Sequence, residues 1–316
     1  MTRLRFDRVG LGVLVAAFIF EGCGGTLARS GTSGSMSPAA AQSSMANAAL
    51  GGDLLYVSEK YSNVTNVYTY PRGQLVASLT YPGGNSTGGL CSDKKGDVFI
   101  TTAYAIYEYQ HGNATPVATI GGTADGCSVD PITGDLAAAI PSGAIAVYRP
   151  GPQYQWHLPR VFNISGLRYD GYDTKGNLFV DGSASSAPPF FKELPRGGSK
   201  FENVTLNKLF AKPGNIEWDG HYLAVGDGLN LLIRRFAISG TRGTLMGLLH
   251  LAGPSQGEQF WIHDGTTIAP AYSHGWIAGF WNYPRGGFAY KAIPETSAYG
   301  ATVSVLGGPA QRHVKP

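Results

Sequence analysis

Two short segments carry the side chains best suited to chemistry in this 316-residue chain. Asn215 and Glu217 alternate along one predicted strand, and Trp261 and His263 do the same along another. Amide and carboxylate oxygens bind Ca²⁺ or Mg²⁺, and a histidine beside a glutamate can act as acid and base. Asn215, Glu217 and Asp227 could form a divalent-cation site. Polar side chains on inner strands more often line a water-filled channel, so we expect Asn215, Glu217, Trp261 and His263 to be channel-lining and assign no catalytic residue or metal ligand.

Six other residues are candidates for contacting a ligand, because they fall on the longer connections between predicted strands. They are Tyr61, Tyr104, Asp181, Asp227, Tyr272 and His274. Binding residues are often carried by loops that a rigid scaffold positions, and exposed aromatic patches mark interaction surfaces. An exposed patch containing Tyr61, Tyr104 and Tyr272 is therefore expected.

Cys91 and Cys127 fall on corresponding predicted strands of two adjacent repeats. A disulfide between them is possible in an exported protein, provided that their Cα atoms lie within about 7 Å of each other. Two buried free thiols are an equal alternative on sequence grounds. Thiol catalysis is not expected, since the sequence places no histidine beside either cysteine.

A recurring four-residue motif indicates the architecture that must position these side chains. It ends in glycine and begins at Tyr70, Tyr109, Tyr148, Leu194, Ala237 and Tyr283, in steps of 39 to 46 residues. Short β-type runs repeated with a period near 40 residues are typical of propeller blades. The sequence therefore predicts an all-β, six-bladed β-propeller of four-stranded antiparallel blades over residues 51–306.

The turns predict which ends of the strands share a face. Asp-x-x-Gly turns, as at Asp93–Gly96, join the first and second strands of a blade, and the recurring four-residue motif joins the third and fourth strands. Both kinds of turn then lie on one rim, and the longer connections lie on the opposite rim. The first blade lacks an inner strand, so we expect residues 301–305 to pair with Leu54–Val57 and close the ring.

The N-terminal segment predicts export, and composition predicts flexible segments on both sides of the propeller. Arg3, Arg5 and Arg8 precede an apolar run, and Phe20–Cys23 is similar to a bacterial lipobox, so residues 1–23 are expected to be a signal peptide with Cys23 as the lipidated residue. The alternative is an ordinary signal peptide that is cleaved elsewhere, near Ala39–Ala41. Residues 24–50, rich in Gly, Ser and Ala, are expected to be a flexible linker, and residues 307–316 a disordered tail.

The charge balance excludes one class of partner. The net charge is only +3, charged residues make up 14% of the chain, and the basic ones are scattered, which argues against nucleic-acid binding. Membrane contact is expected only through the lipid anchor. The protein is expected to be an exported monomer of the bacterial cell envelope, either lipid-anchored or periplasmic or extracellular.

The segments Gly89–Ile100 and Tyr172–Val180 resemble blades of bacterial NHL- or YVTN-type propellers, over roughly residues 50–306. The resemblance implies the fold, but such propellers include binding scaffolds, lyases and lactonases alike. We predict a non-enzymatic scaffold without a cofactor that binds a protein, glycan or small molecule on its long-loop face. The alternative is a lyase or lactonase with Ca²⁺ or Mg²⁺ at the channel mouth, since the Asn, Glu and Asp set resembles the cation site of six-bladed lactonases.

Overall fold

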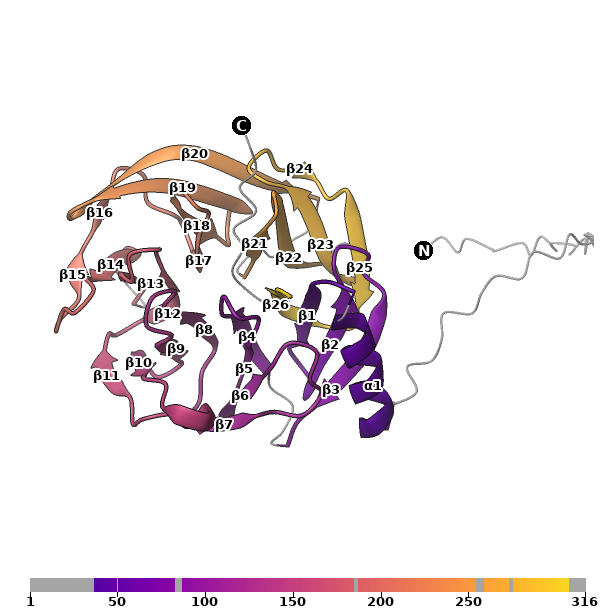
Figure 1. Ribbon diagram of the computed structural model, residues 1–316. Helices are drawn as coiled ribbons and strands as arrows, with labels where there is room; N and C mark the ends of the chain where they lie inside the picture. Colours follow the sequence, from indigo (N-terminus) through magenta and orange to yellow (C-terminus); the bar gives the residue numbers. More distant parts are fainter. Residues whose placement is uncertain are drawn as a thin grey trace, which may run out of the picture. The chain divides into compact units, whose positions relative to one another are not determined.

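The computed structural model describes residues 37–49, 51–82, 87–184, 187–253, 259–272 and 275–306. These residues form six sheets arranged as blades around a central axis (Figure 1). From the axis outward, blade 1 contains β26 (Ala298–Ser304), β1 (Leu54–Glu59), β2 (Val64–Thr69) and β3 (Leu75–Thr80); blade 2 contains β4 (Thr87–Ser92), β5 (Val98–Thr102), β6 (Ala105–Tyr109) and β7 (Ala118–Gly121); and blade 3 contains β8 (Gly126–Val129), β9 (Leu136–Ile140), β10 (Ala144–Tyr148) and β11 (Arg160–Asn163).

The second half of the ring follows the same plan. Blade 4 contains β12 (Leu167–Tyr172), β13 (Leu178–Gly182), β14 (Phe190–Leu194) and β15 (Glu202–Asn203); blade 5 contains β17 (Pro213–Trp218), β18 (Leu223–Asp227), β19 (Leu232–Ser239) and β20 (Arg242–Ala252); and blade 6 contains β21 (Trp261–His263), β22 (Thr266–Tyr272), β23 (Trp276–Asn282) and β25 (Lys291–Glu295). The predicted six-bladed fold is confirmed. In addition, β16 (Thr205–Leu206) and β24 (Gly287–Phe288) pair in parallel with the outer edge of β20.

The ring closes in blade 1 as the strand count predicts. β26 pairs antiparallel with β1, with Leu54 opposite Ser304 and Val57 opposite Ala301. The last strand of the chain thus supplies the inner strand of the first blade and satisfies backbone groups that an open edge would leave unpaired.

Side-chain hydrogen bonds explain the short turns between inner and second strands. In blade 2, Asp93 Oδ1 accepts hydrogen bonds from the backbone N–H groups of Lys95 and Asp97, at 2.8 and 2.9 Å. Asp173 does the same in blade 4. These turns, with those joining third and outer strands, form what we call the short-turn rim. The opposite end of the ring is the long-loop rim.

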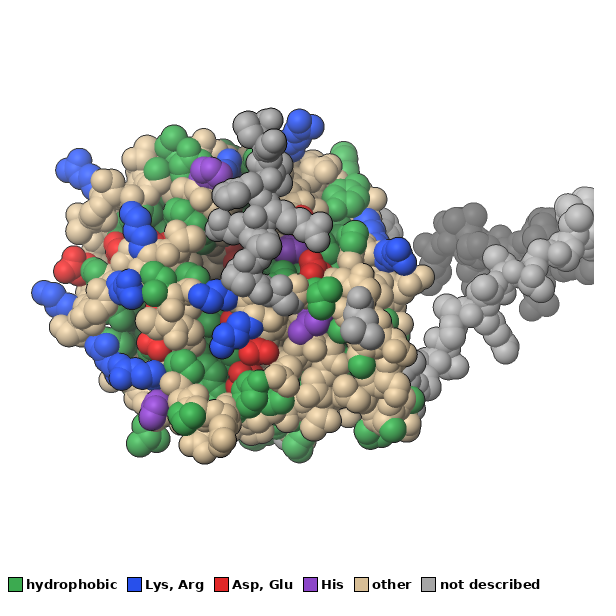
Figure 2. All heavy atoms as spheres, viewed as in Figure 1, with side chains coloured by type: hydrophobic (Ala, Val, Ile, Leu, Met, Phe, Trp, Pro, Cys, Tyr) green, Lys and Arg blue, Asp and Glu red, His purple; other side chains and the backbone are tan. Residues whose placement is uncertain are grey.

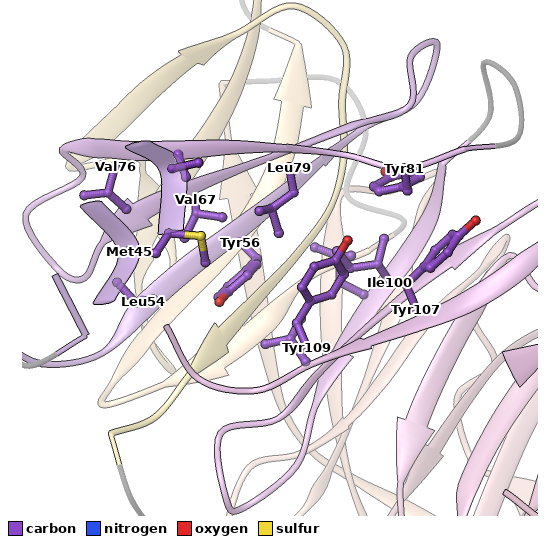
Figure 3. Close-up of a cluster of buried hydrophobic side chains, with 14 of the residues drawn as sticks. Met45, Leu54, Tyr56, Val67, Val76, Leu79, Tyr81, Ile100, Tyr107 and Tyr109 are labelled. Carbon is purple, nitrogen blue, oxygen red and sulfur yellow. The ribbon is translucent and has the colours of Figure 1, made fainter. Parts of the chain in front are cut away.

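One segment expected to be flexible contains a helix instead. Residues 38–49 of the predicted linker form α1 (Pro38–Ala49), which buries Ala41, Met45 and Ala49 against blades 1 and 2. Figure 3 shows Met45 among Leu54, Tyr56 and Val76. The linker prediction does not hold for these residues, because Ala41, Met45 and Ala49 are spaced four residues apart and form one helical face that packs against two blades.

Polar contacts fix the same helix. The Gln42 side chain donates to the Gly112 carbonyl at 3.3 Å and accepts from the Ala114 N–H at 2.7 Å. The predicted signal peptide, Cys23 and the C-terminal tail lie outside the described residues. Within those residues, no helix has the length and apolar content needed to cross a bilayer.

The two cysteines of adjacent inner strands are joined. Cys91 on β4 and Cys127 on β8 form a disulfide with a Cα–Cα distance of 5.6 Å. The sequence left this bond open, because it could not fix the distance between the two strands. The chain-entropy relation for a disulfide that closes a loop of this size gives a stabilisation of about 4 kcal/mol. It ties blades 2 and 3 together close to the axis.

Candidate functional site

A cavity of about 410 Å³ lies at the axial end of the long-loop rim. Its lining comes from the points where strands of blades 1 to 5 begin or end, and consists of Lys60, Thr87, Asp125, Arg168, Tyr169, Ser183, Lys212, Pro213 and Tyr299. The ring therefore brings together residues that are far apart in sequence. We call this space the axial cavity.

Positive charge dominates the axial cavity among the described residues. Lys60, Arg168 and Lys212 line it, against the single carboxylate of Asp125. Burial lowers the pKa of Lys212, and the charges of Arg168 and Lys60 lower it further. Burial raises the pKa of Asp125, while the same two cations act in the opposite direction. Three cations from three blades thus act on one another across this space, and an anion would relieve their repulsion.

Tyrosine side chains lie beside the cations. Lys60 Nζ lies 4.9 Å from the ring centroid of Tyr299 and 5.8 Å from that of Tyr61. Burial, with a contribution from Asp125, raises the pKa of Tyr299 to about 12, so its hydroxyl stays protonated at neutral pH and can donate a hydrogen bond. The wall therefore offers apolar ring surface together with donors.

Gln259 occupies the axis next to the axial cavity. Its buried amide Nε2 donates to the Asp125 carbonyl at 3.3 Å. A Cβ at Gly89 on β4 would lie 2.5 Å from Gln259 Nε2, and one at Gly300 on β26 would lie 2.7 Å from Oε1. A larger residue at either position would require the end of the Gln259 side chain to shift. Trp261, predicted to line the channel, packs against the hydrophobic clusters of blades 1 and 6 and of blades 2 and 3.

The predicted loop residues divide into exposed and buried ones. Tyr61 is 65% exposed, and Tyr104 and Tyr272 are also exposed. Tyr61 is connected to the axial cavity through its contact with Lys60. Asp181 and Asp227 are fully buried and cannot contribute to an exposed surface. His274 lies outside the described residues.

Both buried aspartates have structural partners. Asp227 pairs with Arg234 at 2.8 Å and also accepts from Asn230, and these hydrogen bonds outweigh burial and lower its pKa. Asp181 Oδ2 accepts from the Gly214 N–H at 3.2 Å. Burial raises the pKa of Asp181 well above its usual value.

The four residues considered as a cation site do not converge. The Asn215 amide donates to Glu217 Oε1 at 3.2 Å and to the Phe260 carbonyl at 2.7 Å. Burial raises the pKa of Glu217 to about 8. Asp227 is paired with Arg234, as described above. His263 Nε2 lies 3.1 Å from Asp53 Oδ2, beside the β21–β22 turn on the short-turn rim. The set is therefore distributed over three separate places.

A small group capable of binding a metal ion does exist at His263. Its Nε2 and one carboxylate oxygen each of Asp53 and Asp264 lie within 4.8 Å of one another. Asp264 is largely exposed. Sequence reasoning missed Asp53 because it precedes the first strand and reaches blade 6 only after the ring has closed.

The cations of the axial cavity were also missed. Lys60 follows β1 directly, Arg168 is the second residue of β12, and Lys212 directly precedes β17. The sequence does contain a signal for this site, namely three basic residues at strand ends on the same rim. The grouping can be recognised only after each basic residue has been assigned to one of the two rims.

No protein-family model matches this chain, and neither does any curated protein. Solved structures do resemble it. A chain of the nidogen/laminin complex is 14% identical, with a TM-score of 0.61, and the match covers 81% of this chain and 100% of that one. A protein of unknown function from Bacteroides caccae is 13% identical, with a TM-score of 0.61 and coverage of 80% and 99%. The Cps50 (Swd1) propeller domain of Myceliophteria thermophila is 9% identical, with a TM-score of 0.53 and coverage of 77% and 84%. At these identities the likeness establishes the propeller fold.

Proposed function

We propose that this protein is a non-enzymatic binding propeller, of the NHL or YVTN type, that holds an anionic ligand in its axial cavity. The observation that carries the proposal is the convergence of Lys60, Arg168 and Lys212 on one space with a single carboxylate, Asp125. Among the described residues, no carboxylate lies within 4.0 Å of the Arg168 guanidinium. Its planar donors are suited to a carboxylate or phosphate.

The walls of the axial cavity narrow the class of ligand. The Tyr299 ring in the wall provides apolar contact beside Lys60, and its hydroxyl can donate a hydrogen bond. The Tyr61 ring also contacts Lys60 but does not line the cavity. A volume of about 410 Å³ lies within the range of small-molecule sites. A sugar acid, a sugar phosphate or the acidic end of a glycan combines these properties. We do not adopt the lyase or lactonase alternative, because Asn215, Glu217, Asp227 and His263 occupy separate places.

Calorimetric titration of the purified protein with glucuronate, glucose 6-phosphate and neutral glucose tests this proposal. We expect the two anions to bind and glucose not to bind. Arg168→Gln should weaken anion binding by roughly tenfold to a hundredfold, because a charge-assisted hydrogen bond contributes about 1.5–3 kcal/mol. Arg242→Gln, at an exposed arginine on the outer strand β20, is the matched control. Equal affinity of Arg168→Gln and the unaltered protein, or equal binding of glucose, would exclude the anion site.

We also propose export to the bacterial cell envelope with lipid attachment at Cys23, which the pattern of residues 1–23 supports. Expression in a bacterial host with radiolabelled palmitate should label the unaltered protein and place it in the membrane fraction. Cys23→Ser should remove the label and release the propeller, whereas the same substitution cannot affect the disulfide between Cys91 and Cys127. Labelling that persists in Cys23→Ser would contradict lipidation at this residue.

A further inference from the structure

A second cavity, of about 700 Å³, lies on the short-turn rim between blades 2 and 3. We call it the inter-blade cleft. One wall comes from the β4–β5 turn and β6, with Asp97 and Glu108. The other comes from the segment after β10, with Tyr154 and Trp156. Because the two mouths lie on opposite rims, this site is independent of the axial cavity.

Glu108 is an unusual residue for the wall of a cleft. Its side chain is only 4% exposed, and the Trp156 indole N–H donates to its Oε2 at 2.9 Å. Its second oxygen has no hydrogen-bond partner among the described residues. Burial raises the pKa of Glu108 to about 7, the Trp156 hydrogen bond acts in the opposite direction, and Asp97 and Asp93 raise it further. A buried carboxylate with unused acceptor capacity is stabilised by any positive group placed beside it.

A short loop holds the aromatic wall in place. The Trp156 ring meets Phe99 edge to face, with centroids 5.7 Å apart and planes at 84°. The backbone pairs Pro150 with Trp156, which closes the loop. Gln153 and Tyr154 both have positive φ, at 53° and 59°. The Tyr154 hydroxyl is hydrogen-bonded to Gln110, which anchors the loop to blade 2.

The charges of the inter-blade cleft are the reverse of those in the axial cavity. Asp93, Asp97 and Glu108 line it, while among the described lining residues Lys95 is the one Lys or Arg and His111 the one histidine. Charged side chains of both signs are mixed over the face that Figure 2 shows. A preference for cations must therefore come from the local grouping of Asp93, Asp97 and Glu108. Carboxylates beside aromatic rings form the combination that recognises ammonium and guanidinium groups.

We propose that the inter-blade cleft binds an organic cation, as a primary ammonium or guanidinium group, with Glu108 and Asp97 as the acceptors and Trp156 and Tyr154 as the aromatic wall. The cation is carried either by a free small amine or by a lysine or arginine side chain of a peptide. The cavity is large enough for either source.

Titration calorimetry on the full chain with spermidine, agmatine and the peptide Gly-Arg-Gly tests the proposal, with glucose as the neutral probe. We expect at least one cationic probe to bind, and Glu108→Gln and Asp97→Asn each to weaken it tenfold or more. Glu193→Gln is the matched control, because Glu193 stands opposite Phe179 in blade 4 as Glu108 stands opposite Phe99 in blade 2. Melting curves of all variants establish that they are folded. Binding of amines alone or of the peptide alone supports the proposal and identifies the source.

The pH dependence gives a second readout. Burial raises the pKa of Asp97 to about 6, and Asp93 raises it further. Affinity for the cation should therefore increase from pH 5 to pH 8, as Asp97 and Glu108 ionise in the presence of Asp93, Lys95 and His111. Three results would each overturn the proposal: no cationic probe binds, glucose binds as tightly as the cations, or Glu108→Gln and Glu193→Gln bind equally well.

Discussion

Replacing Met45 by alanine is expected to lower the free energy of unfolding by about 4 kcal/mol, within the range of about 2–5 kcal/mol seen for such core truncations. Met45 is 0% exposed and lies between Tyr56 and Val76 in the cluster that joins blades 1 and 2. Truncation would leave a cavity that the surrounding strands cannot fill, because each belongs to a hydrogen-bonded sheet. Urea denaturation followed by far-ultraviolet circular dichroism measures the change.

The chain provides a matched control for this substitution. Met246 lies on the outer strand β20 and is 52% exposed, so Met246→Ala should change the free energy of unfolding by less than about 0.5 kcal/mol. If Met45→Ala and Met246→Ala have the same stability, helix α1 does not contribute to the folded domain. The linker would then extend through residue 50, as the composition alone predicts.

The second large effect is a loss of stability at higher pH that depends on Asp170. This inner-strand carboxyl is 2% exposed and accepts a 2.5 Å hydrogen bond from Ser128, and its Oδ1 has no hydrogen-bond partner in the part of the chain that the structure describes. Burial raises its pKa to about 7, while the Ser128 hydrogen bond opposes the rise. The pKa of Asp170 is near 4 in the unfolded chain and about 7 in the folded protein. Between these two pH values, folding is accompanied by the uptake of a proton at Asp170. The stabilisation is complete below pH 4 and is lost as pH rises through 7, by about 4 kcal/mol at most.

Asp170→Asn should flatten this dependence, because asparagine keeps the shape of the side chain without the charge. Denaturation midpoints measured between pH 4.5 and 8 would show a smaller decline for Asp170→Asn than for the unaltered protein. Some decline should persist, since burial also raises the pKa of Asp181 and Glu217. Glu202→Gln, at an exposed carboxylate on β15, should not alter the profile. Identical profiles for Asp170→Asn and the unaltered protein would show that Asp170 is already ionised in the folded state at neutral pH.

The sequence predicted the ring because local chemistry repeats in every blade. Asp93 and Asp173 form their turns through hydrogen bonds within a few residues, so a short window contains the whole signal. The closing strand followed from a count of strands and from the backbone groups an unpaired edge would expose. The disulfide between Cys91 and Cys127 could not be decided, because it depends on the separation of two neighbouring inner strands.

The candidate site could not be predicted in the same way. Lys60, Arg168 and Lys212 come together only because three blades converge on one axis. His263 pairs with Asp53 across the closed ring, and Asp227 is neutralised by Arg234 seven residues later. Residues 38–49 were mistaken for linker because the burial of Ala41, Met45 and Ala49 depends on the surface of blades 1 and 2 that they contact, which composition does not describe.

The order of strands in blade 1 has a consequence for biosynthesis. Of the described strands, β26 is synthesised last, and until it emerges β1 presents an unpaired edge to solvent. A nascent chain can thus form its other blades but cannot complete the circle before roughly residue 304 is available. A chain that terminates before β26 would leave the edge of β1 unpaired and accessible to proteases and chaperones. The closed ring therefore requires synthesis through about residue 304.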